Sequence, residues 1–132
     1  MWEIELLIEG KFFSIYAIKK PGVESFEAKK NIEELIPNKK QQKQVLNYFF
    51  RLFERIADTG SIHNKEQFRQ VRGSIYEFKK KTGIRIMCFI RKRTIYLLHG
   101  FKKERQKTPK KEIEKAEQLI KQISQYWEVN NG

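Results

Sequence analysis

The order of hydrophobic and polar residues predicts two strands at the start of the chain and two helices after them. Apolar or alternating runs at residues 2–8 and 12–18 flank Glu9-Gly10-Lys11, which predicts a β-hairpin over residues 1–20. Helical periodicity then covers residues 24–58, with a break at Pro37. The second helix has one apolar stripe and ends at Gly60; the stripe comprises Val45, Phe49, Leu52, Phe53 and Ile56.

The pattern returns to strands after a polar stretch. Residues 61–70 are predicted to be irregular, with a short helical turn at 65–68. Three apolar runs follow at 73–80, 84–91 and 94–101, joined by short connections. Short connections favour adjacent antiparallel strands.

A final helix is predicted over residues 109–127. Thr108 is suited to cap it and Pro109 to occupy its first position. Its apolar stripe would dock on the sheet or on a partner; the stripe comprises Ile113, Ala116, Ile120, Ile123 and Trp127. We therefore expect a single domain, residues 1–132, of the α+β class. A helical hairpin and a C-terminal helix would pack on a twisted, mainly antiparallel β-sheet.

Positive charge is concentrated in the predicted sheet. Residues 69–111 contain fifteen Lys or Arg and two acidic residues, a net charge of +13, whereas the whole chain carries +12. A folded surface with this charge is typical of proteins that bind a polyanion, most often nucleic acid. The alternative is a solvated basic surface that serves solubility.

The composition argues against several other classes. The single cysteine, Cys88, lies in an apolar run, which indicates a core residue in a reducing compartment. Apolar runs are shorter than a membrane span, and the start has acids where a signal peptide has bases, so a cytoplasmic protein without membrane contact is expected. With two histidines, His63 and His99, and no phosphate-loop or paired-cysteine motif, no metal or cofactor is expected.

Three segments resemble the RelE/ParE toxin superfamily. Residues 72–79 (RGSIYEFK) resemble its G-x-x-E-L-R strand, with Lys79 where many members have Arg. Residues 83–89 (GIRIMCF) resemble the next strand, which carries an Arg. Residues 97–103 (LLHGFKK), 107–109 (KTP) and 112–113 (EI) resemble the L-H-G-F-x-K-K, K-T-P and E-I signature of the phage-derived, HigB-like branch. The resemblance covers about residues 24–123, and the N-terminal hairpin is longer than in many relatives.

This resemblance implies the toxin of a type II toxin–antitoxin system, an endoribonuclease that cuts mRNA in the ribosomal decoding site. It also implies a helix-turn-helix protein antitoxin that forms a hetero-oligomer with the toxin. Metal-independent RNA cleavage needs proton transfer and neutralisation of the charge that develops on the phosphate. Clustered Arg and Lys can supply that neutralisation and can also hold ribosomal RNA.

Arg85 is the first candidate, as a phosphate contact that stabilises the transition state; a surface ion pair is its structural alternative. His99 is expected to face the substrate as an acid–base or stacking group, although an isolated histidine is more often structural. The remaining candidates are basic residues that could equally be solvated: Lys79 and Lys102 as catalytic groups, and Arg72, Lys103 and Lys107 as RNA-binding groups.

Three neighbours of these candidates are assigned structural roles. Glu77 is expected to be an ion-pair partner of nearby bases rather than a catalytic base. Tyr76 and Tyr96 could stack on a nucleotide, but packing is favoured.

Two alternative functions remain open. A ParE-like gyrase inhibitor would share the fold without a nuclease site. A non-catalytic nucleic-acid-binding module, which includes an inactive toxin, would use the basic sheet for binding alone.

Overall fold

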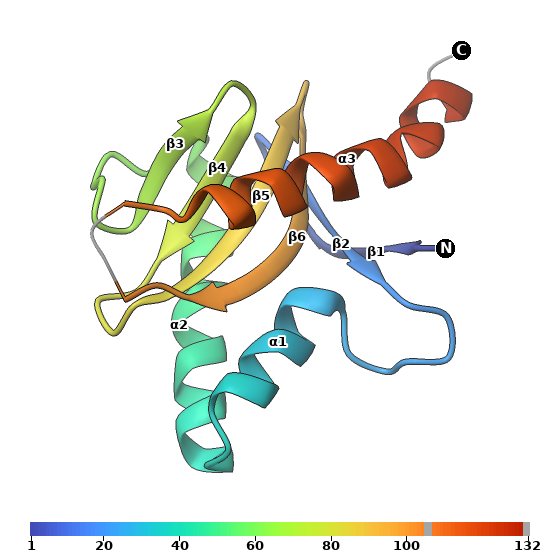
Figure 1. Ribbon diagram of the computed structural model, residues 1–132. Helices are drawn as coiled ribbons and strands as arrows, with labels where there is room; N and C mark the ends of the chain where they lie inside the picture. Colours follow the sequence, from blue (N-terminus) through green and yellow to red (C-terminus); the bar gives the residue numbers. More distant parts are fainter. Residues whose placement is uncertain (105–106, 131–132) are drawn as a thin grey trace.

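Helices cover both faces of one twisted β-sheet (Figure 1), in a computed structural model that describes residues 1–104 and 107–130 of the chain. The described residues form six strands and three helices, which confirms the predicted α+β class and the mainly antiparallel sheet. The elements are β1 (Glu3–Glu9), β2 (Ser14–Lys19), α1 (Glu27–Leu35), α2 (Lys39–Thr59), β3 (Phe68–Arg72), β4 (Ile75–Lys79), β5 (Ile84–Arg91), β6 (Thr94–Lys102) and α3 (Lys110–Asn130).

The N-terminal hairpin is part of the main sheet. The strand order is β1-β2-β6-β5-β4-β3, and β2 runs parallel to β6 while the other neighbouring pairs are antiparallel. Ile15 and Ala17 of β2 are completely buried. This placement makes β6 an internal strand, with β2 on one side and β5 on the other.

The prediction for residues 61–70 was partly wrong. Phe68–Arg72 forms β3, an edge strand paired with β4, and the turn between them places Gly73 at φ +54°. The first predicted strand, 73–80, is accordingly the shorter β4. An edge strand with one polar side needs little apolar sequence, so the short run FRQVR carries a weak strand signal.

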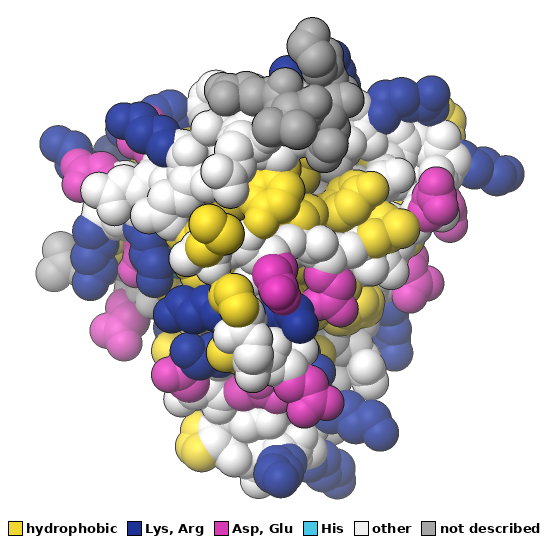
Figure 2. All heavy atoms as spheres, turned by 90° about the vertical axis from the view of Figure 1, so that its right-hand side faces the viewer, with side chains coloured by type: hydrophobic (Ala, Val, Ile, Leu, Met, Phe, Trp, Pro, Cys, Tyr) yellow, Lys and Arg dark blue, Asp and Glu magenta, His cyan; other side chains and the backbone are white. Residues whose placement is uncertain are grey.

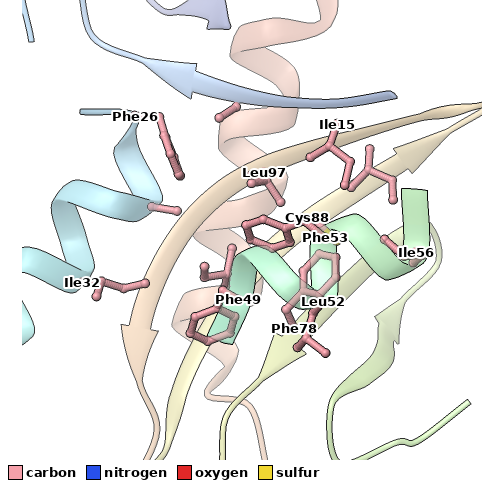
Figure 3. Close-up of a cluster of buried hydrophobic side chains, with 14 of the residues drawn as sticks. Ile15, Phe26, Ile32, Phe49, Leu52, Phe53, Ile56, Phe78, Cys88 and Leu97 are labelled. Atoms are coloured by element: carbon pink, nitrogen blue, oxygen red, sulfur yellow. The ribbon is translucent and has the colours of Figure 1, made fainter. Parts of the chain in front are cut away.

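The larger core lies between the sheet and the first two helices (Figure 3). The α2 stripe points into it, and the Phe53 ring meets Phe78 of β4 edge to face at 4.8 Å. Cys88 is completely buried here, as predicted for a core residue, and burial raises the pKa of its thiol. Gly60 ends α2 in the left-handed conformation at φ +85°, also as predicted.

The second core lies on the opposite face, beneath α3 (Figure 1). Ala116 and Ile123 of α3 are completely buried and pack with Met87 and Leu98 of the sheet. The apolar stripe of this helix therefore docks on the sheet, the first of the two predicted possibilities. Because successive strand residues alternate between faces, each strand serves both cores.

The surface away from the start of α3 has mixed character. Figure 2 shows acidic and basic side chains interspersed around exposed hydrophobic ones on this side. Among the described residues, no helix is long and apolar enough to cross a membrane. Their histidine, cysteine and acidic side chains form no group of three that could hold a metal ion.

Candidate nucleic-acid interface

The end of β4, the start of β5 and the end of β6 lie near the start of α3 (Figure 1). Four basic side chains gather there. Strand pairing sets Lys79 beside Arg85, and Arg69 of β3 beside Glu77. Phe78 points into the α2 core, so Glu77 and Lys79 face the α3 side by alternation. We call this group, Arg69, Lys79, Arg85 and Lys103 around Glu77, the basic cluster.

Glu77 is the anionic centre of the basic cluster. Its side chain has 0% exposure and lies 2.9 Å from Arg69 Nη2 and 3.9 Å from Arg85 Nε. The Thr108 hydroxyl donates to its second oxygen at 2.8 Å and accepts from Arg69 Nη2 at 3.1 Å. A buried carboxylate requires such partners. The predicted ion-pair role of Glu77 is therefore confirmed, and the Thr108 hydroxyl, expected to cap α3, joins this network.

Arg85 is buried like Glu77 and is fixed by hydrogen bonds to the backbone. It is 9% exposed, and its Nη1 donates to the backbone oxygens of Lys80 at 2.7 Å and Ile84 at 3.1 Å. Burial lowers the pKa of the guanidinium, and the Glu77 carboxylate opposes that shift. Because Glu77 also pairs with Arg69 at the shorter distance of 2.9 Å, one carboxylate is shared by two guanidinium groups and the three side chains together retain a net positive charge.

The two lysines of the basic cluster are perturbed in the same direction. Burial lowers the pKa of Lys79, and the positive charges of Arg69 and Arg85 lower it further. Burial also lowers the pKa of Lys103, which is 8% exposed, with Arg85 as the next cause. Lysines of this kind exchange protons closer to neutral pH than solvated ones do.

The basic cluster opens to solvent through a polar pocket of about 380 Å³. Its cations outnumber its single acid, and its lining comprises Lys79, Lys81, Thr82, Gly83, Arg85, Lys103 and Glu104. Such a pocket attracts anions.

A second pocket of about 760 Å³ lies at the start of α3 and shares Glu104 with the first. It contains Lys102 and Lys107, two of the predicted site residues, together with Lys111 and Glu112. The structure therefore distributes five predicted residues over two adjoining pockets: Lys79, Arg85 and Lys103 in the first, and Lys102 and Lys107 in the second.

His99 does not face this surface, so the predicted orientation of its ring was wrong. The side chain is completely buried, stacks on Phe101 and lies 3.1 Å from Glu112 Oε1 through Nε2. Burial lowers its pKa to about 4, so the ring is neutral at pH 7. The register of β5 and β6 shifts between Ile86 and Cys88. The bulge brings His99 under α3 instead of leaving it at an open strand end.

Arg72 also lies outside the basic cluster. It ends β3, opposite Ile75, and forms an exposed ion pair with Glu117 of α3 at 3.2 Å. β4 separates that point from Lys79 by four residues, or roughly 13 Å. Arg72 accordingly does not line the pocket that Lys79 and Arg85 share.

Sequence reasoning missed Arg69, Lys81 and Tyr48. Arg69 could have been predicted as the cross-strand partner of Glu77, but only if β3 had been recognised as a strand. Tyr48, whose hydroxyl reaches the end of β4, has no local sequence signal because it lies beside the α2 stripe. Tyr76 stacks on Phe68 at 5.1 Å, in keeping with the packing role favoured for it.

Fold and site together define an α+β protein with an anion-attracting pocket built on three strands. The chain belongs to the family described as phage-derived protein Gp49-like (DUF891), which matches residues 33–121, about two thirds of its length. The matched region begins within α1, ends within α3 and includes the whole basic cluster. No curated protein matches the chain.

Proposed function

We propose that this protein is the toxin of a type II toxin–antitoxin system and that it cleaves mRNA on the ribosome. The observation that carries the proposal is the basic cluster, in which a buried carboxylate, Glu77, fixes two arginines beside two lysines of lowered pKa. Membership of the Gp49-like family, which is associated with toxin–antitoxin toxins, supports the first part of this proposal.

The reaction would use the first pocket for the scissile phosphate. Arg85 stabilises the charge that develops on the phosphate oxygens. The 2′-oxygen forms a new bond to phosphorus and loses its proton to the neutral amine of one lysine. The bond from phosphorus to the 5′-oxygen breaks, and the ammonium of the other lysine protonates that oxygen. The products are a 2′,3′-cyclic phosphate and a 5′-hydroxyl, and Lys79 and Lys103 are the two lysines.

The other predicted residues take supporting places in this proposal. Lys102 and Lys107, in the adjoining pocket, bind neighbouring phosphates of the strand. Arg72 contacts flanking or ribosomal RNA. His99, being buried and neutral, holds α3 in place through Glu112 and transfers no proton to substrate.

The proposed partners are polyanions and one protein. The net charge of +13 over residues 69–111 favours ribosomal RNA as the docking surface. A helix-turn-helix antitoxin encoded beside the toxin would neutralise it in a hetero-oligomer.

Primer extension on a translated message tests the proposal. Induced expression should produce cuts within codons that disappear when ribosomes are absent. Arg85→Ala should abolish the cuts, whereas Arg51→Ala, which removes an exposed arginine from α2, should leave them unchanged. Loss of plasmid supercoiling without such cuts would instead establish a gyrase inhibitor. RNA binding without cleavage would establish a non-catalytic module.

A further inference from the structure

Tyr48 connects the helix layer to the end of β4. Its ring meets Phe49 edge to face at 5.3 Å, and its hydroxyl donates to the backbone oxygen of Lys79 at 2.6 Å. Its helix, α2, lies on the opposite side of the sheet from α3. Tyr48 therefore supports the basic cluster from behind.

The Lys79 oxygen needs a donor from outside the sheet. Lys79 N donates to Gln67 O at 2.8 Å, just before β3 begins at Phe68. The amide that would return this bond, Gln67 N, turns away and donates to the backbone oxygen of Asn64 at 2.9 Å. Since a partly buried carbonyl requires a partner, the Tyr48 hydroxyl replaces the missing ladder bond.

The same peptide segment also anchors Arg85. Arg85 Nη1 donates to Lys80 O, while the Lys80 ammonium lies over the Tyr48 ring, 4.8 Å from its centre. Lys79 Nζ in turn donates to the oxygen of Lys65 at 3.1 Å. Any shift of residues 79–80 would therefore move the Lys79 ammonium and the Arg85 guanidinium together.

We propose that Tyr48 is a positioning residue that holds the Lys79–Lys80 segment so that Lys79 and Arg85 point into the same pocket. It touches no substrate and acts through the backbone. The expected effect of Tyr48 on cleavage rests on the proposed function. The expected effect of Tyr48 on the position of Lys79 is independent of that function.

Tyr48→Phe is the discriminating variant because it keeps the ring and removes the hydroxyl. Tyr126→Phe is the matched control. Tyr126 lies on α3, away from the basic cluster, and its hydroxyl also donates to a backbone oxygen, that of Trp2. We expect both variants to fold with similarly reduced melting temperatures. Tyr48→Phe should lower kcat for cleavage about tenfold with little change in KM, and Tyr126→Phe should leave kcat unchanged.

Titration of the side-chain carbon signals of labelled lysine, assigned with Lys79→Arg, gives an activity-independent measurement. Release of the segment should let Lys79 move into solvent and away from Arg85, so its pKa should rise in Tyr48→Phe and stay constant in Tyr126→Phe. The limb of the cleavage profile that reports the titration of Lys79 should move in the same direction. An unchanged Lys79 titration in Tyr48→Phe would overturn the inference. Absence of cleavage by the wild-type protein would refute the proposed function and leave this titration valid.

Discussion

The hydroxyl of Thr108 donates a 2.8 Å hydrogen bond to the buried carboxylate of Glu77, 31 residues earlier in the chain. This bond joins the segment that leads into α3 to the middle of β4. Because Arg69 bonds both groups, the start of the helix and the basic cluster form one network. A substitution at Thr108 should therefore alter the basic cluster, and a substitution at Glu77 should alter the start of α3.

Replacement of Glu77 by Gln should be strongly destabilising. The variant removes the charge that pairs Arg69 and Arg85 and leaves an uncompensated buried cation, which typically costs about 3–5 kcal/mol. Urea unfolding measures the loss. Glu117→Gln breaks the exposed pair with Arg72 and should cost less than about 1 kcal/mol. Equal effects of the two variants would contradict the central role of Glu77.

The stability of the protein should fall on acidification through His99. Its pKa is lowered from 6.5 to about 4 in the folded state, so between these values the unfolded chain binds the proton and the folded protein does not. Folding stability must then decrease as the pH falls from about 6.5 to about 4. The loss is on the order of 2–3 kcal/mol.

His99→Gln provides the control for this pH dependence, because glutamine can still donate to Glu112 and does not titrate. Urea unfolding between pH 7 and pH 4.5 should show a steeper loss for the wild-type protein than for the variant. Carboxylates titrate in both proteins, so the difference between the two curves isolates the histidine. Parallel curves would show that His99 is not held neutral by burial.

Gly83 should tolerate no side chain. It has φ +98°, and a Cβ there would lie 2.6 Å from the backbone oxygen of Lys103. Gly83→Ala should therefore displace Lys103 and destabilise the fold by more than the roughly 1 kcal/mol expected for the positive φ alone.

Gly73→Ala isolates the conformational part of that effect. Gly73 also has a positive φ, +54°, but a Cβ there would meet nothing within 4 Å. Thermal unfolding of both variants, together with RNA affinity, distinguishes the two causes. We expect weaker RNA binding in Gly83→Ala alone, and equal losses in the two variants would argue against the clash.

Strong periodicity made most of the fold predictable. The stripes of α2 and α3 and the apolar runs of β5 and β6 bury large side chains, so their order in the sequence reflects their packing directly. β3 was not predicted because an edge strand is constrained mainly by its single neighbour. Without β3, the position of Arg69 beside Glu77 could not be predicted either.

The candidate site was predictable only in part, for the same physical reason. Lys79 and Arg85 lie on strands whose register follows from short turns, Lys103 directly follows β6, and the three do meet at one pocket. The burial of His99 depends on a bulge in β6, and the place of Tyr48 depends on a contact 31 residues away. Contacts of this kind arise from the tertiary arrangement, and local sequence patterns do not predict them.

The parallel pairing of β2 with β6 also sets when the sheet can be completed during synthesis. Ser14 of β2 pairs with Thr94 of β6, eighty residues later, so the centre of the sheet cannot close until most of the chain has been synthesised. Thr108, which completes the buried network around Glu77, is made later still. Pairing of β3, β4 and β5 can bring Arg69, Lys79 and Arg85 together over a short stretch of chain, but the buried network around Glu77 is complete only once Thr108 has joined it.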